Sequence, residues 1–102
     1  MAKTLTCPIK GFEKVGITFP EADELTMAHY NKFYSGFEEA PAGASYQMRL
    51  VFGAVALCDD IEGIDAKNVL GMPINYSPVF DWIVNEVYVN TYAPAVLVPK
   101  NS

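Results

Sequence analysis

Hydrophobic and polar residues alternate in two short segments near the start of the chain, residues 4–7 and 15–19. Alternation with a period of two is typical of a strand with one buried face, and Ile17 and Phe19 then share that face. A proline and a glycine lie between the two segments and supply turn chemistry. The pattern therefore predicts an N-terminal β-hairpin.

The period changes to that of a helix after the hairpin. Thr26 is a suitable N-cap residue, and apolar residues then recur every three or four positions, which predicts a helix over residues 26–39. The stripe is unusually aromatic and consists of Met27, Tyr30, Phe33, Tyr34 and Phe37. Core packing is one interpretation of this stripe, and an aromatic patch that faces a partner is the other. In the second interpretation, Tyr30, Tyr34 and Phe37 are candidate partner-binding residues.

A second apolar segment follows a loop of small residues. Ser45 can cap a helix, and residues 46–59 are apolar on most sides, as expected for the central helix of a small domain; a buried strand is the alternative. Gly53 predicts the close approach of a neighbouring element, because glycine weakens a helix interior by about 1 kcal/mol relative to alanine. Gly63 is expected to end this helix in a left-handed conformation. Residues 64–75 have an irregular pattern with at most one helical turn.

The last helix is predicted to begin at Ser77 and Pro78, a cap residue followed by a proline at the first helical position. Its buried stripe is expected to consist of Val79, Trp82, Ile83 and Val87. Trp82 should then pack on the central helix. Because Pro94 disfavours helical conformation at the residue before it, the helix is expected to end near Tyr92.

Residues 95–99 have the apolar composition of a strand and are expected to be extended. A free apolar strand invites pairing with another chain, so this segment should dock on the hairpin of its own chain or on a neighbouring subunit or partner. Val96, Leu97 and Val98 are therefore candidate partner-binding residues. Together the elements predict an α+β fold, a single domain over residues 1–102 with an N-terminal β-hairpin, a three-helix core and an extended C-terminal segment.

The formal net charge of −5 narrows the choice of partner. Nucleic acids and anionic membranes are bound through clustered lysine and arginine, so neither is expected as a partner. Acidic residues cluster instead, and the candidate partner-binding residues among them are Asp59, Asp60, Glu62 and Asp65. A basic protein surface would complement this cluster, while solubility and turn capping are the alternative explanations.

The first residues lack the apolar segment of a signal peptide, and the longest apolar run is shorter than the roughly 20 residues of a membrane span. A cytoplasmic protein is therefore expected. Cys7 and Cys58 are then expected to be reduced thiols, with a disulfide between them as the alternative.

The sequence offers few residues for catalysis or metal binding. His29 is the only histidine and lies near the start of a predicted helix, where a structural role is expected. A structural zinc site needs about four cysteine or histidine ligands, and the acidic run lacks the spacing of a calcium-binding loop. No glycine-rich phosphate loop is present. We therefore expect no metal, no cofactor and no enzymatic activity.

Three short motifs stand in a recognisable order: Phe19-Pro20, Asp60-Ile61-Glu62-Gly63-Ile64 and Asp81-Trp82-Ile83. With the aromatic helix between the first two, this order resembles small tail-assembly-chaperone-type proteins of tailed bacteriophages and prophages. The resemblance implies a non-catalytic protein that keeps tail subunits or a tape-measure protein soluble in the host cytoplasm until the virion is assembled.

The leading hypothesis is accordingly a protein-binding assembly factor or small structural protein of a phage virion, with homo-oligomers as a possible form. The alternative hypothesis is a small acidic inhibitor or adaptor protein that masks a basic surface of a host or phage protein.

Overall fold

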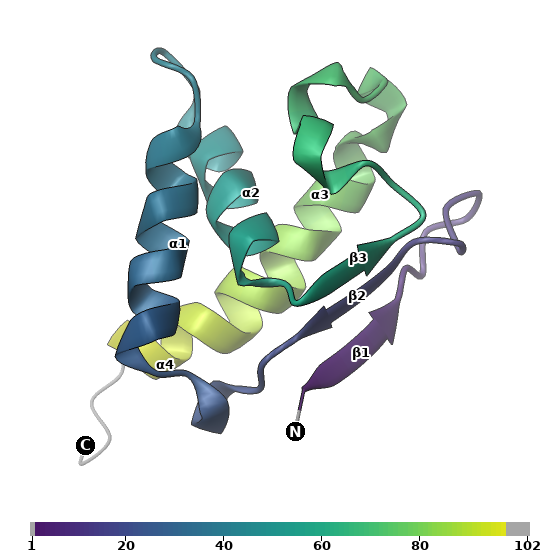
Figure 1. The fold of residues 1–102 in the computed structure, drawn as a ribbon. Coiled ribbons are helices and arrows are strands. Elements are labelled where there is room, and N and C mark those ends of the chain that lie inside the picture. Colours follow the sequence, from purple (N-terminus) through teal and green to yellow (C-terminus); the bar gives the residue numbers. More distant parts are fainter. Residues whose placement is uncertain (1, 98–102) are drawn as a thin grey trace.

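The computed structural model describes residues 2–97 of the 102-residue chain. A small antiparallel sheet lies on one side of a group of packed helices, which confirms the predicted α+β fold (Figure 1). The sheet has three strands in the order β1 (Lys3–Thr6), β2 (Gly16–Phe19) and β3 (Asp60–Glu62).

The predicted N-terminal hairpin is confirmed, because β1 and β2 pair antiparallel. Ile17 and Phe19 of β2, the central strand, are buried on one face as predicted. Ile17 lies opposite Leu5 in β1 and opposite Ile61 in β3, so an apolar row crosses the inner face of the sheet. The strand β3 was not predicted, since the sequence pattern placed its acidic residues beside the end of a helix.

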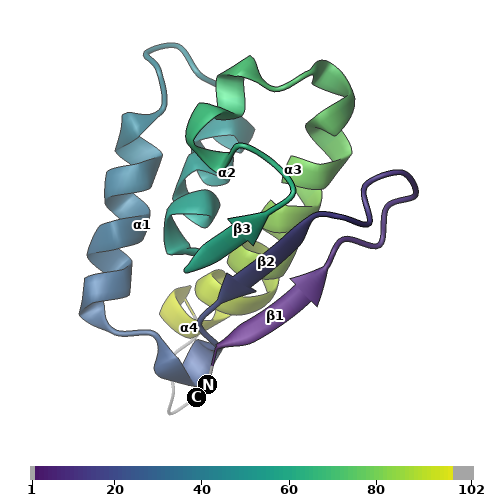
Figure 2. The ribbon, with the colours of Figure 1, turned by 45° about the vertical axis from the view of Figure 1, so that its right-hand side comes forward.

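Helices α1 (Met27–Glu39) and α2 (Tyr46–Leu57) lie side by side and confirm the two predicted helices (Figures 1 and 2). The backbone N–H of Thr26 donates to Nδ1 of His29 (2.9 Å), so His29 has a structural role in capping α1. The Ser45 hydroxyl accepts a backbone N–H from the first turn of α2 (3.1 Å), as its position predicted.

The two helices approach each other closely at two glycines. A Cβ atom at Gly53 of α2 would lie 2.5 Å from the Phe33 ring, which confirms that a neighbouring element approaches this position. A Cβ atom at Gly36 of α1 would lie 2.6 Å from the Cβ of Ala56. Side chains at these positions would push the helices apart, because protein interiors are close-packed.

The chain after Tyr76 forms one continuous helical run with a change of register. It consists of α3 (Ser77–Ile83), the π-helix η4 (Val84–Tyr92) and α4 (Ala93–Leu97). The prediction of an extended C-terminal segment is therefore wrong for residues 95–97, while residues 98 and 99 lie outside the described part of the chain.

The wider π turn explains how the helix passes Pro94. In an α-helix a proline ring clashes with the carbonyl four residues earlier and leaves it without a hydrogen bond. Here the Ala93 N–H donates to the carbonyl of Tyr88, five residues earlier. The Thr91 hydroxyl donates to the carbonyl of Glu86 (2.9 Å). Ala93, the residue before Pro94, is helical, with φ −60° and ψ −45°.

The core lies between the sheet and this helical run, which crosses behind the sheet (Figure 2). Val79, Ile83 and Val87 are fully buried, as the predicted stripe requires. Trp82 is only half-buried at the border of the core, because it lies about 100° around the helix from Ile83.

The segment between β3 and α3 lacks a regular α-helix or strand, but it contains two 3₁₀ helices, η2 (Ala66–Gly71) and η3 (Ile74–Tyr76), where at most one helical turn was predicted. Gly63 has the predicted left-handed conformation, with φ 85°, but it follows β3 rather than a helix. The 3₁₀ helix η1 (Ala22–Glu24) leads into α1 and contacts α4.

Candidate functional site

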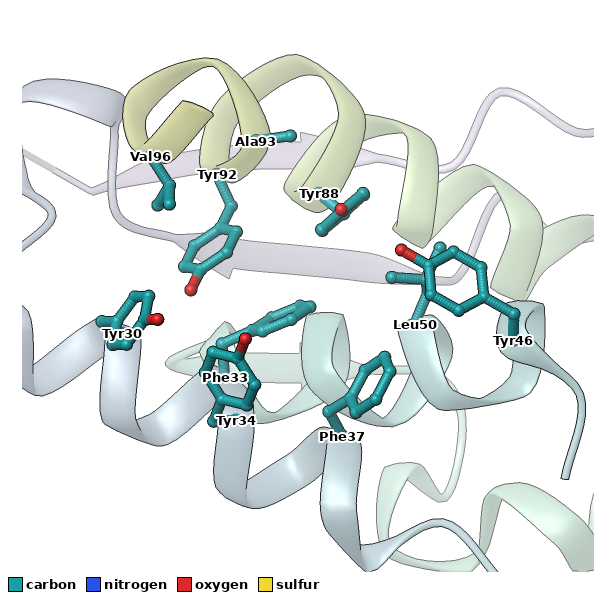
Figure 3. Close-up of a pocket in the computed structure, with 10 residues that line it drawn as sticks. All are labelled: Tyr30, Phe33, Tyr34, Phe37, Tyr46, Leu50, Tyr88, Tyr92, Ala93 and Val96. Atoms are coloured by element: carbon teal, nitrogen blue, oxygen red, sulfur yellow. The ribbon is translucent and has the colours of Figure 1, made fainter. Parts of the chain in front are cut away.

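An open cavity of about 300 Å³ lies between α1 and the C-terminal helical run, and α2 closes one end of it (Figure 3). Its lining is mostly aromatic and comes from elements that are distant in sequence. The residues that line it are Tyr30, Phe33, Tyr34 and Phe37 of α1, Tyr46 and Leu50 of α2, and Tyr88, Tyr92, Ala93 and Val96 of η4 and α4. We call this cavity the aromatic groove.

Phe33 forms the floor of the aromatic groove and is 5% exposed. Its ring stacks on Tyr92, with centroids 4.3 Å apart, and on Tyr88, with centroids 5.4 Å apart. Such ring pairs contribute about 0.5–1.5 kcal/mol each beyond the burial of their area. The stacking therefore holds α1 against η4 and gives the groove a preformed floor.

Tyr30, Tyr34 and Tyr46 form the rim and are exposed, with exposed fractions of 37%, 48% and 64%. The Tyr30 and Tyr34 rings lie 5.1 Å apart, and the Phe37 and Tyr46 rings lie 6.0 Å apart. Phe33 thus follows the core interpretation of the aromatic stripe, whereas Tyr30 and Tyr34 are accessible, as the partner interpretation requires.

Burial and contacts between neighbouring hydroxyls raise the pKa values of three tyrosines in the groove. A hydrogen bond with Tyr30 raises the pKa of Tyr34. Burial and then a hydrogen bond with Tyr46 raise the pKa of Tyr88, and burial raises the pKa of Tyr92 to about 12. The hydroxyls of Tyr34, Tyr88 and Tyr92 are therefore uncharged near neutral pH.

The Tyr92 hydroxyl is buried and points toward the space between α4 and α1 (Figure 3). Within residues 2–97, no group forms a hydrogen bond with it. A buried hydroxyl without a partner costs about 1–3 kcal/mol. A polar atom of a bound molecule would recover part of this free energy.

A second cavity, of about 800 Å³, adjoins the aromatic groove, and Tyr30, Tyr92 and Val96 line both. It reaches η1 and the start of α1, where Leu25 and Met27 contribute to its walls. The two cavities together form a depression that runs from the start of α2 to η1, which suits a chain segment better than a compact small molecule.

Charged side chains are sparse along this depression. In the described part of the chain, its lining contains the carboxylate of Asp23 and no lysine or arginine. Glu38 lies close enough to contribute to the raised pKa of Tyr34. Arg49 lies at the border, with its guanidinium carbon 5.7 Å from the centroid of the Phe37 ring.

The acidic cluster lies apart from the groove, and the structure corrects the expected position of its members. α2 ends at Leu57, and the Asp59 N–H then donates to the carbonyl of Thr18 in β2 (2.7 Å). This pairing starts a strand where the sequence pattern predicted the end of a helix. Asp60 and Glu62 are consequently exposed on β3, at an edge of the sheet.

Asp65, the last member of the acidic cluster, follows the turn-capping interpretation. Its side chain accepts the backbone N–H of Lys67 (3.2 Å) at the start of η2.

Of the three C-terminal candidate partner-binding residues, the structure describes the side chain of Val96. Val96 lines the aromatic groove from α4 and is 43% exposed. Leu97 is the last residue of α4, and its side chain and all of Val98 lie outside the described part of the chain. Residues 95–97 belong to the helix α4, which contacts η1, in place of the strand that was expected to dock on the hairpin or on a neighbouring subunit or partner.

Sequence reasoning missed the contribution of Tyr46, Tyr88 and Tyr92 to the groove. Five of the six tyrosines in the chain line it. The spacing of four residues between Tyr88 and Tyr92 was an available signal, because it places both on one face of a helix. The expected end of the helix at Tyr92 hid the fact that this face continues to Val96.

Residues 2–97 contain no group of three or more His, Cys, Asp or Glu side chains that could hold a metal ion. Cys7 and Cys58 are free and form no disulfide with each other. Burial, and then the nearby charge of Asp59, raises the pKa of Cys58 to about 12. Its thiol is therefore a poor nucleophile at neutral pH.

No protein-family model, curated protein or solved structure matches the chain. In the part of the chain that the structure describes, no helix has both the length and the apolar character that a bilayer crossing requires.

Proposed function

We propose that this protein is a non-catalytic binding factor that holds a segment of another protein in the aromatic groove. The observation that supports this function is the gathering of exposed tyrosine rings around one depression. Tyrosine is enriched at protein interfaces and among the residues that dominate binding energies. It supplies a large contact area at a low cost in conformational entropy.

The packing beneath the rim favours binding as well. Phe33, Tyr88 and Tyr92 already stack on one another, so the floor of the groove needs little reordering when a segment enters. Preorganisation of this kind improves affinity by lowering the entropic cost of association.

The resemblance to phage tail-assembly chaperones suggests a specific role for such a groove. The bound segment would belong to a tail subunit or a tape-measure protein, which this protein would keep soluble in the host cytoplasm during virion assembly. An open groove suits that role, because the segment can leave when the tail forms. Homo-oligomers are compatible with this role.

The exposed edge of the sheet supports a second candidate function. Asp60 and Glu62 on β3, with Asp59 beside them, concentrate negative charge that would complement a basic surface. A small acidic inhibitor or adaptor protein would use this edge in place of the aromatic groove.

Site-specific photo-crosslinking separates the two candidates. A benzoylphenylalanine probe replaces Tyr34, Tyr46 or Glu62 one at a time in the full chain, which is then irradiated in the native lysate. All three positions are exposed, so the probe should not disturb the fold. We expect the probes at Tyr34 and Tyr46 to label the same protein and the probe at Glu62 to label none.

Labelling from position 62 alone would contradict the groove and favour the acidic inhibitor. Competition with unlabelled protein provides a control for the groove. An excess of the wild-type chain should suppress labelling from Tyr46, and an equal excess of a Tyr34→Ala variant should suppress it less, because the variant lacks a ring that contributes to binding.

A further inference from the structure

The faces of the rim tyrosines are suited to a cation. The π-electrons of an aromatic ring give its face a negative potential, which attracts a guanidinium or ammonium group within about 6 Å of the centroid. Tyr34 and Tyr46 are 48% and 64% exposed, so a side chain of another protein can reach their rings. The groove therefore offers several ring faces around one small space.

The acidic side chains near the groove also favour a cation. Asp23 lines the adjoining cavity, and Glu38 lies near Tyr34. No lysine or arginine within residues 2–97 lines either cavity. The net charge of −5 adds a long-range attraction for basic partners.

The chain itself places a guanidinium on this ring cluster. Arg49 lies 5.7 Å from the centroid of Phe37, which is within the range of a cation–π contact. The rings at the border of the groove thus already accommodate one guanidinium group.

The Tyr92 hydroxyl supplies a polar contact that the rings lack. It is buried against the groove, and no described residue forms a hydrogen bond with it. Its oxygen has lone pairs that can accept an N–H from a guanidinium, which carries five such donors, once the side chains that cover it move aside.

We propose that the aromatic groove binds an arginine side chain of the partner segment. This inference rests on the proposed function and names the chemistry that the groove recognises. Arginine fits better than lysine, because its planar guanidinium stacks on rings and is more weakly hydrated than an ammonium group. A partner segment without a basic residue is the competing outcome.

An NMR titration of the full chain tests the proposal with two probes of equal shape. Nα-acetyl-arginine methylamide carries the guanidinium, and Nα-acetyl-citrulline methylamide replaces it with a neutral urea group. We expect the arginine probe to bind about threefold or more tightly, with the largest shifts at Tyr30, Tyr34 and Tyr92. Equal affinities, or shifts centred on Asp60 and Glu62, would overturn the proposal.

Three variants sharpen the test. Tyr34→Leu keeps an apolar side chain at an exposed position and removes the ring, so the preference for arginine over citrulline should fall toward unity. Arg49→Gln removes a nearby positive charge and should increase the affinity of the arginine probe. The double variant Asp60→Asn/Glu62→Gln lowers the negative charge away from the groove and should retain the preference. An undiminished preference in Tyr34→Leu would overturn the proposal.

The crosslinking experiment tests the proposed function, and the NMR titration tests the arginine site, so the two can be contradicted separately. Crosslinking from Tyr34 and Tyr46 without any preference for arginine would leave the proposed function standing and overturn the arginine site. The absence of crosslinks from Tyr34 and Tyr46, together with equal affinities of the arginine and citrulline probes, would overturn both the proposed function and the arginine site.

Discussion

At the scale of residues, the side chain of Phe33 connects its own helix, α1, with α2 and η4. Its ring stacks on two tyrosines of η4 and fills the space that a side chain at Gly53 of α2 would need. The same ring therefore fixes the distance between α1 and α2 and forms the floor of the aromatic groove. Substitutions near it should change stability through packing rather than through charge.

Gly53→Ala tests this packing. Alanine favours a helix interior over glycine by about 1 kcal/mol, yet its Cβ would lie 2.5 Å from the Phe33 ring. We expect the free energy of unfolding to fall by about 1–2 kcal/mol, because overpacking outweighs the helical preference. Urea denaturation measures the change. In a Phe33→Leu background the same substitution should cost less, and an equal cost in both backgrounds would contradict the contact.

Tyr92→Phe tests the unpartnered hydroxyl. Removing a buried hydroxyl that has no hydrogen bond should raise the free energy of unfolding by about 1 kcal/mol. Tyr88→Phe is the matched control, since Tyr88 is only half-buried and removal of its hydroxyl should bring no gain. A loss of stability in Tyr92→Phe, measured by the same denaturation, would indicate that the hydroxyl has a partner after all.

At the scale of elements, local sequence patterns predicted where the helices α1 and α2 begin, but they did not predict the pairing of strands that are distant in sequence. Thr26 and Ser45 set the starts of α1 and α2, because capping depends on residues only three or four positions apart. The strand β3 depends on pairing with β2, which lies more than forty residues earlier, as the register of Ile61 with Ile17 requires. No local pattern contains that information.

The candidate site was likewise predicted where it depends on local spacing and missed where it depends on the path of a distant segment. The aromatic spacing in α1 identified Tyr30, Tyr34 and Phe37 as candidates, and all three line the groove. The opposite wall depends on how the chain passes Pro94, where Ala93 is helical despite the usual effect of proline on the preceding residue. Sequence reasoning therefore found one wall of the groove and missed the other.

The edge strand β3 gives a prediction at this scale. Exposed charges on an edge strand oppose pairing with another chain. Asp60→Thr with Glu62→Thr removes both charges and adds residues that favour strands, so we expect increased self-association, measured by light scattering. Glu38→Gln with Glu39→Gln removes the same charge from exposed positions of α1 and is the control. Equal association of the two variants would attribute the effect to net charge alone.

For the whole molecule, two acidic groups with raised pKa values, the half-buried Cys58 thiol and the buried Tyr92 hydroxyl, link stability to alkaline pH. Burial raises the pKa of Cys58 from its ordinary 9.0 to about 12, and that of Tyr92 from 10.0 to about 12. The unfolded chain releases these protons at a lower pH than the folded chain does. Their contribution to stability is thus complete below pH 9 and declines as the pH rises toward 12.

We therefore expect the free energy of unfolding to decrease between about pH 9 and pH 12. Cys58→Ala should delay the onset of this decrease to about pH 10, where tyrosines begin to titrate. Denaturant titrations at a series of pH values measure both profiles. Coincident profiles for the wild type and the variant would show that the Cys58 thiol ionises as readily in the folded chain as in the unfolded one.

The π-helix η4 also bears on how insertions and deletions would affect this chain. Each π turn takes in one residue more than an α turn, so the loss of one residue within Val84–Tyr92 could be absorbed by a return to α register. The residues before and after the deletion would then keep their positions around the helix axis, because the return to α register compensates for the lost residue. Tyr92 and Val96 would stay in the groove. A homologue shorter by one residue at this point would share both this core and this binding surface, whereas the same deletion in a regular α-helix would rotate every later residue by about 100°.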